Sequence, residues 1–172
     1  MGNKTNLRRT AKADERGAPY HCATRLIAAA QEILEDEGLT ALSLRAVARR
    51  AGVSPPAPYH HFPDKQALLD AVAERGFAAL TAAMTTRMDK VADAAVRLDA
   101  SGISYVAFAV ANPALCGLMF SAIVQNASAG AALGRARQRA YAVLQDAAAA
   151  CAPDFGLRDG EALAAHLLCR PS

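Results

Sequence analysis

The chain has 172 residues, of which 53% are hydrophobic and 5% aromatic, and a formal net charge of +3. This length suits one or two small domains with a packed core. Alanine dominates the apolar residues and is a strong helix former, so the composition predicts an all-α protein. The four cysteines are scattered, without C-x-x-C pairs or His/Cys ligand spacing. This usage favours reduced thiols in a cytoplasmic protein.

The excess positive charge lies near the N-terminus. Residues 1–65 contain ten Lys/Arg against seven Asp/Glu, whereas residues 66–172 contain nine of each. Residues 1–19 form a sparse basic arm, a pattern typical of a solvated tail and also of segments that bind nucleic acid. The arm lacks the apolar run of a signal peptide, so we expect cytoplasmic localisation.

One uncharged segment, from Ala100 to Gly134, superficially resembles a membrane span. Asn112 and Pro113 interrupt it as an N-cap followed by a proline in the first helical position. Each half is then too short and too polar to cross a bilayer. We therefore expect two core helices, at residues 95–112 and 113–127, and no membrane partner.

Residues 20–65 predict a helix-turn-helix domain. In the segment from His21 to Leu39 apolar residues recur on one helical face, and Gly38 is placed to end the helix. Further along, Ser43 can cap a second helix and Gly52 can supply the turn that a following helix needs. Helix, glycine turn and helix make the helix-turn-helix arrangement.

The sequence SPPAPYHHF at residues 54–62 covers the start of the third helix. With Ser54 as N-cap, Pro55 and Pro56 take the first two helical positions, whose N–H groups have no intrahelical partner. Pro58 gives up one hydrogen bond, the one to the Ser54 carbonyl. We expect a tight first turn, a regular helix from about Ala57 onward, and Ala57 as the main N–H donor to a phosphate.

From about Leu26 to Leu69 the chain resembles the DNA-binding domain of the TetR family of transcriptional regulators. The residues that carry the resemblance are Gly38–Arg45, Val47, Ala48, Ala51–Ser54 and Tyr59–Lys65, followed by Leu68. The resemblance implies a three-helix unit whose third helix enters the major groove. It puts Ser43, Arg45, Tyr59, His60 and Lys65 where family members contact phosphates. Pro55, Pro56 and Ala57 stand where base contacts are usual, at places where the family more often has basic, glycine or polar residues.

The prolines predict an unusually apolar face toward the groove. We expect Pro55, Pro56 and Ala57 to contact thymine methyl groups, and His60 or His61 to contribute to base readout. The two histidines also raise the alternative of a metal site. Adjacent histidines point to different sides of a helix, and no carboxylate or cysteine stands at ligand spacing, so we expect neither metal nor cofactor. Phe62 is expected in the core.

Residues 66–172 predict a helical bundle for ligand binding and dimerisation. Asp64 can cap a long helix over residues 65–88, and further helices are expected at 133–152 and from about Arg158. The phrase YVAFAVANPALCGLMF also resembles the regulatory domain of one TetR subgroup.

Large apolar side chains of this bundle are candidates to line an effector pocket, with Gln125 and Asn126 as polar anchors. The candidates are Met84, Met88, Tyr105, Phe108, Met119, Phe120 and Tyr141. Each of them could equally fill the core, and only the set favours a pocket.

The resemblance implies a homodimeric transcriptional regulator, a repressor that binds a near-palindromic operator in double-stranded DNA and is released by a small-molecule effector. Two recognition helices would lie roughly 34 Å apart, and residues 134–152 would supply one dimer helix. The alternative is a helical protein-interaction module without sequence-specific DNA binding. An enzyme is not expected, because the sequence has no phosphate-binding glycine loop, no paired carboxylates and no nucleophile with a base.

Overall fold

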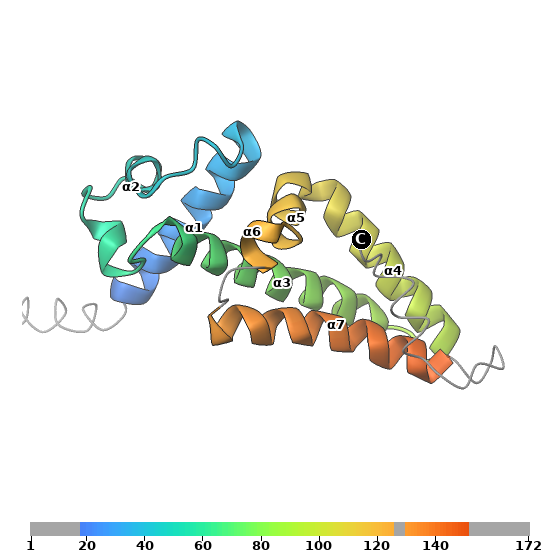
Figure 1. The fold of residues 1–172 in the computed structure, drawn as a ribbon. Helices are drawn as coiled ribbons and strands as arrows, with labels where there is room; N and C mark the ends of the chain where they lie inside the picture. The colour runs from blue at the N-terminus through green and yellow to red at the C-terminus, as the bar shows by residue number, and fades with distance from the viewer. Residues whose placement is uncertain (1–17, 126–129, 152–172) are drawn as a thin grey trace, which may run out of the picture. The chain divides into compact units, whose positions relative to one another are not determined.

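The computed structural model describes residues 18–125 and 130–151. The described residues form helices joined by turns, with no strand among them, which confirms the expected all-α class. The chain divides into two compact units, one up to Leu68 and one from Leu69 (Figure 1). They are called below the N-terminal unit and the C-terminal unit. Residues 1–17 of the predicted basic arm, Asn126 and the helix expected near Arg158 lie outside the described residues, whereas residues 18 and 19 of the arm belong to the first helix.

The N-terminal unit contains α1 (Ala18–Glu37), α2 (Leu44–Ala51), the 3-10 turn η1 (Ala57–His60) and the first residues of α3 (Lys65–Met88). α1 packs on α2, and α2 packs on η1. The core of this unit consists of apolar side chains from α1, α2, α3 and the connecting loops, namely Leu26, Ala29, Ala30, Ile33, Leu34, Leu42, Leu44, Val47, Ala48, Phe62 and Leu68, and Pro58 of η1 is also buried. The expected inward faces of the first two helices are therefore confirmed.

Two glycines and one serine define the ends of these helices, as expected. Gly38 follows α1 with φ 81° and Gly52 follows α2 with φ 65°, a left-handed backbone that glycine adopts without steric cost. The N–H groups of Gly52 and Val53 donate to the carbonyls of Arg49 and Ala48, which closes α2 in a Schellman motif. At the other end of α2, Ser43 Oγ accepts a hydrogen bond from the Ala46 N–H at 3.2 Å.

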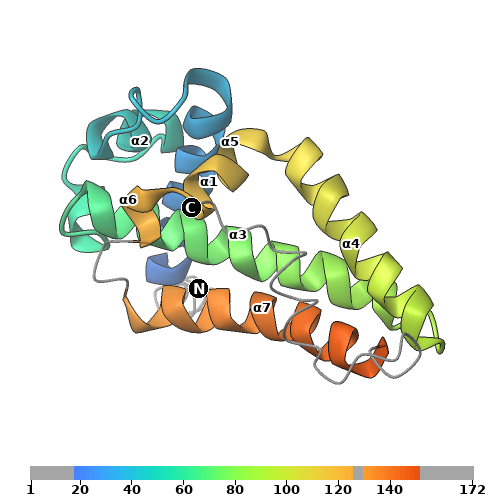
Figure 2. The ribbon, with the colours of Figure 1, turned by 45° about the vertical axis from the view of Figure 1, so that its right-hand side comes forward.

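The C-terminal unit contains the rest of α3, α4 (Ala94–Ala111), α5 (Pro113–Met119), α6 (Ala122–Gln125) and α7 (Ala131–Cys151). α4 packs against α7, and both views show α7 running alongside α3 (Figures 1 and 2). Asp64 caps α3 as expected, since its Oδ1 accepts from the Ala67 N–H at 2.8 Å. The apolar spacing of the sequence predicts a buried face for α3 at Leu68, Leu69, Val72, Phe77, Leu80 and Met84, and all six side chains are buried.

The single helix expected over residues 113–127 is wrong, because the structure breaks it into α5 and α6 at Phe120 and Ser121. The Ser121 hydroxyl and the Ser121 N–H both donate to the Leu118 carbonyl, at 2.8 and 3.1 Å. A serine that bonds locally to the backbone competes with helix continuation. At the start of α5, Asn112 occupies the expected N-cap position, but its side chain donates instead to the Phe108 carbonyl at the end of α4.

The expectation that α4 is a core helix is also wrong. Only Ala100, Ser101 and Ser104 of this helix are buried, while Ile103, Val106 and Val110 are more than half exposed. α4 is the one helix of the described chain that is long and apolar enough to cross a membrane, with a mean hydropathy of 1.3. Length and hydropathy alone do not define a membrane span.

Gly76 allows α3 and α5 to approach closely inside the C-terminal unit. A Cβ atom at this position would lie 2.6 Å from Met119 Sδ and 3.2 Å from Leu115 Cδ1. Met119 and Leu115 are themselves buried. The absence of a side chain at Gly76 thus leaves room for Met119 and Leu115 of α5 to pack against α3.

Candidate functional site

Within the segment at residues 54–62 the structure has only the short 3-10 helix η1 (Ala57–His60), and the regular helix expected from Ala57 onward is wrong. The Ala57 N–H donates to the Ser54 carbonyl at 3.0 Å, and the Tyr59 N–H donates to the Pro56 carbonyl at 3.1 Å. Both bonds span three residues, as in a 3-10 helix. Pro58 has no N–H to reach Ser54 across four residues, so the tighter bond from Ala57 takes that carbonyl. The 3-10 helix ends at His60, and the N–H groups of His61 and Phe62 both donate to the Pro58 carbonyl, at 3.0 and 2.8 Å. The chain does not continue as a helix beyond Phe62, because the residue before a proline is disfavoured in α geometry.

The same turn corrects the expectation that Ala57 is the main backbone donor to a phosphate. Its N–H is already bonded within the turn, and the neighbouring Pro55, Pro56 and Pro58 carry no N–H at all. This segment therefore offers side chains rather than backbone N–H groups at its start. The rule that a helix N-terminus binds anions does not apply to it.

The start of the turn is exposed to solvent, whereas Pro58 within it is buried. Pro55 and Pro56 are exposed, Ala57 is half-buried, and Tyr59 is 52% exposed. His60 is exposed, whereas His61 is half-buried with its ring centroid 6.3 Å from that of Phe62. Phe62 is buried, which confirms its expected place in the core. The exposed apolar surface of Pro55, Pro56 and Tyr59 is of the kind that contacts thymine methyl groups in the major groove.

The exposed face of α2 carries two arginines, Arg45 and Arg49, one helical turn apart. Within the described residues neither of them forms an ion pair. Like charges at this spacing repel one another, although Arg49 in the last turn of α2 also interacts favourably with the helix dipole. The sequence analysis missed Arg49, although its spacing of four from Arg45 was a usable signal. Ser43, directly before α2, and Ser54, in the loop after α2, are both exposed.

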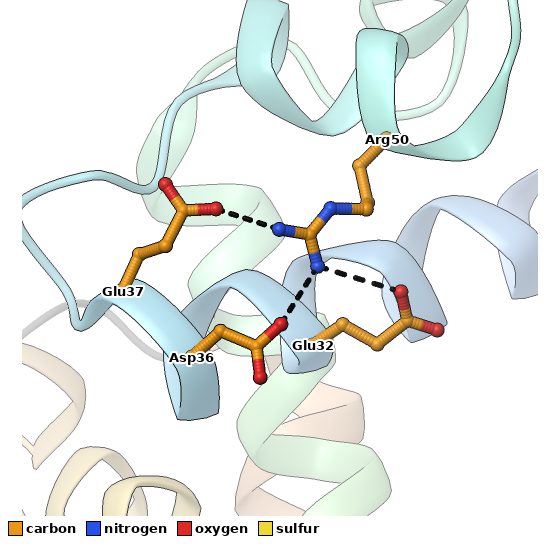
Figure 3. A network of polar contacts seen from close by, with 4 residues as sticks. All are labelled: Glu32, Asp36, Glu37 and Arg50. Atoms are coloured by element: carbon orange, nitrogen blue, oxygen red, sulfur yellow. Dashed lines mark hydrogen bonds and ion pairs between the residues drawn. The ribbon is translucent and has the colours of Figure 1, made fainter.

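A different pair of arginines fastens α2 to α1. Arg50 of α2 is hydrogen-bonded to Asp36 at 3.0 Å and Glu37 at 2.6 Å, and lies 3.7 Å from Glu32 (Figure 3). In return, Arg25 of α1 donates to the Ala51 carbonyl at 2.7 Å. The sequence analysis missed both contacts, because they join residues more than ten positions apart.

The three carboxylates around Arg50 lie in the last two turns of α1, where negative charge opposes the helix dipole. Arg50 offsets this unfavourable charge. The hydrogen bond that Arg50 donates to Asp36, together with the charges of Glu37, Asp36 and Glu32, raises the pKa of the Arg50 guanidinium above its usual value. Arg50 is therefore engaged in holding α2 on α1, unlike Arg45 and Arg49.

Lys65, at the start of α3, is exposed and its Nζ donates to the Leu39 carbonyl at 3.2 Å. An ammonium group has three donors, so this bond leaves donors for a phosphate. The bond also ties the start of α3 to the loop that precedes α2.

The C-terminal unit holds an open pocket of about 770 Å³. Its lining comes from α3, α4, α7 and the end of α5, and consists of Phe77, Leu80, Tyr105, Phe120, Gly134, Arg137, Gln138, Ala140, Tyr141 and Leu144. Of the expected pocket residues, the structure thus brings together Tyr105, Phe120 and Tyr141.

The other expected pocket residues lie elsewhere. Met84, Met88 and Met119 are buried in the core and do not line this pocket, which corrects the expectation for them. Phe108 lies on a separate groove between α3 and α4, of about 800 Å³. Gln125 and Asn126 fall outside the side chains that the structure describes. Within its described part, the chain has no cluster of three His, Cys, Asp or Glu side chains suited to a metal ion.

The fold and the exposed segment together define a helical protein of the helix-turn-helix class. The family model for bacterial regulatory proteins of the tetR family matches residues 26–72. Over 49 residues the chain is 51% identical to the class C tetracycline repressor protein of Escherichia coli, a stretch that covers 28% of this chain and 22% of that repressor. The chain thus spans less than a quarter of the length of this relative.

Solved structures match over more of the chain. A protein of unknown function from Rhodococcus sp. RHA1 is 36% identical with a TM-score of 0.76, covering 86% of this chain and 77% of the other. A tetR-family regulatory protein from Rhodococcus RHA1 is 26% identical with a TM-score of 0.68, covering 85% and 78%. The chain belongs to the TetR family of transcriptional regulators.

Proposed function

We propose that this protein is a DNA-binding transcriptional regulator, a cytoplasmic homodimeric repressor that a small-molecule effector releases from a near-palindromic operator. Regulators of this family are DNA-binding transcriptional repressors that respond to ligands. The observation that carries the proposal for this chain is the solvent-exposed turn of Pro55, Pro56 and Ala57, beside a helix whose two arginines have no ion-pair partner among the described residues.

Phosphates would bind to the polar and basic side chains that flank the turn. Arg45 and Arg49 supply charge from α2, Lys65 supplies it from α3, and Ser43, Ser54, Tyr59 and His60 supply hydroxyl or ring donors. Phosphate contacts fix the register of a protein on DNA but do not read sequence. Sequence would be read by the apolar turn through thymine methyl groups and by His60 or His61 through base edges.

Effector binding would act through α3. This helix begins at Lys65, which we assign to a phosphate, and it carries Phe77 and Leu80 in the wall of the pocket. Twelve residues of helix separate Lys65 from Phe77, a distance of about 18 Å. A ligand that favours one position of α3 shifts the population of DNA-competent dimers only by its differential affinity for the two states.

Dimerisation would use the face of α7 that the chain leaves open. The stripe of Leu133, Ala136, Ala140, Leu144 and Ala147 is buried within the chain itself, so the alanines on this stripe are not available to a partner. Exposed residues of α7 outside this stripe, which include Ala149 and Ala150, remain for the contact with a second copy.

The experiment that tests the proposal is selection of bound duplexes from a random DNA pool with the full chain. Recovery of a palindromic motif with a centre-to-centre spacing near one helical turn supports sequence-specific, dimeric binding. The affinity for the recovered duplex should fall steeply with salt, because phosphate contacts release counterions. Failure to enrich any sequence would favour the helical protein-interaction module instead.

A further inference from the structure

The pocket of the C-terminal unit has an apolar wall and a single charged lining residue. Phe77, Leu80, Ala140 and Leu144 supply aliphatic or aromatic surface, and Arg137 supplies the only charge. No carboxylate lines this pocket among the described residues. The lining therefore combines a large apolar surface with one fixed cation.

Three aromatic rings form one continuous wall of the pocket. The centroids of Phe77 and Phe120 lie 5.6 Å apart with the rings at 80°, an edge-to-face arrangement. Tyr105 lies 6.3 Å from Phe120 at 58°. Tyr141 adds a fourth ring from α7, and both Tyr141 and Phe120 remain more than a third exposed. Exposed aromatic faces at a pocket favour a flat ligand whose ring can stack or meet them edge-on.

Arg137 is free to receive an anion. Its side chain is exposed and forms no ion pair within the described part of the chain. The one acidic residue of α7, Asp146, is nine positions further along the helix, about 13 Å away along its axis. A guanidinium binds a carboxylate through two parallel hydrogen bonds, a geometry that a neutral or cationic ligand does not match.

Gly134 keeps space open in the pocket one turn before Arg137 on α7. A Cβ atom added there would meet no heavy atom within 4 Å. A glycine inside a helix is less favourable than alanine by about 1 kcal/mol, and packing in the described chain does not require one at this position. The space at Gly134, next to Arg137 in the lining, is large enough to admit ligand atoms.

We infer that the pocket binds a flat aromatic carboxylic acid, with its ring against Phe77, Phe120 and Tyr141 and its carboxylate on Arg137. Gln138 lies beside Arg137 in the lining and supplies a neutral donor to the same group. The inference rests on the proposed function, since the acid would be the effector of the proposed repressor.

The test is calorimetric binding of three aromatic acids to the full-length protein, each paired with its neutral primary amide. The probes are benzoate, trans-cinnamate and 2-naphthoate. At least one acid is expected to bind at least tenfold more tightly than its amide. Arg137→Gln should remove that preference while the affinity for the amide stays the same.

Two further variants separate charge from shape. Arg139→Gln removes an exposed arginine of the same helix that does not line the pocket, and the acid should bind this variant as tightly as it binds the unchanged protein. Gly134→Leu adds a side chain where there is open space, and it should abolish binding of acid and amide alike while the helical circular dichroism signal stays intact.

The inference is overturned if none of the three acids binds, if acids and amides bind equally, or if Arg139→Gln weakens acid binding as much as Arg137→Gln. DNA binding to a selected duplex is measured in parallel. Intact DNA binding with no acid binding refutes the ligand class alone, whereas loss of sequence-specific DNA binding in the unchanged protein refutes the proposed function.

Discussion

The substitution Gly76→Ala tests how tightly α5 packs on α3, because it adds one methyl group between the two helices. A Cβ atom there would come within 2.6 Å of Met119 Sδ and 3.1 Å of Met119 Cγ. Met119 is fully buried, so its side chain has no solvent-filled space into which to move. Gly102, on α4, is the matched control, because a Cβ atom at that position meets nothing within 4 Å.

Two opposing free energies decide the effect of Gly76→Ala on stability. Replacing a helical glycine by alanine stabilises a helix by about 0.5–1 kcal/mol. Against this, Met119 must retreat by roughly 1 Å to restore an ordinary contact distance, and overpacking of a full core costs about 1–3 kcal/mol. Gly102→Ala carries the first contribution without the second. We expect Gly102→Ala to raise the free energy of unfolding by up to about 1 kcal/mol and Gly76→Ala to leave it about 1–3 kcal/mol below that of Gly102→Ala.

Urea denaturation of the two variants and the unchanged protein measures this difference. All three are compared at one protein concentration, because the stability of a dimer depends on concentration. The slope of unfolding free energy against urea should be the same for all three, so that a shifted midpoint reports stability. Equal stabilities of Gly76→Ala and Gly102→Ala would refute the reasoning, since Met119 would then have accommodated the methyl group without cost.

The remaining predictions concern the N-terminal unit. Replacing both Pro55 and Pro56 by alanine should alter affinity or base preference at thymine-containing positions of a selected duplex; if neither changes, the apolar readout is wrong. Arg49→Gln should reduce the slope of log affinity against log salt by about 1 with no change in preferred sequence, and an unchanged slope would mean that Arg49 touches no phosphate. Ser43→Ala removes the hydrogen bond from the Ala46 N–H and should cost about 1 kcal/mol in urea denaturation without DNA; a midpoint equal to that of the unchanged protein would contradict the role of this cap.

Local signals in the sequence were sufficient wherever the determinant lies within one helical turn. Ser43 and Asp64 cap their helices through hydrogen bonds to N–H groups three residues on. Gly38 and Gly52 end theirs because only a left-handed backbone turns the chain there. The buried face of α3 follows from its apolar spacing. These features depend on neighbours in sequence, which is why the all-α class and the helix-turn-helix arrangement were predictable.

Local competition between hydrogen bonds was harder to predict. The sequence analysis identified the three prolines as obstacles to a helix. Whether an α-helix or a 3-10 turn follows them depends on which N–H group donates to the Ser54 carbonyl. In the structure the Ala57 N–H donates to the Ser54 carbonyl. In the same way, the Ser121 hydroxyl takes the Leu118 carbonyl and divides a helix that its composition predicts to be continuous.

The sequence by itself determined the class of the protein, its helix caps, its exposed proline turn and its family, because these depend on residues close together in the chain. Only the tertiary structure decided which side chains share a surface. It joined Arg50 to carboxylates of α1 and left Arg49 without an ion-pair partner among the described residues. It also put Met84 and Met119 in the core and Arg137 in the pocket. The reason is that charge pairing and the lining of a pocket depend on which helices lie side by side, and no periodicity along a single helix contains that information.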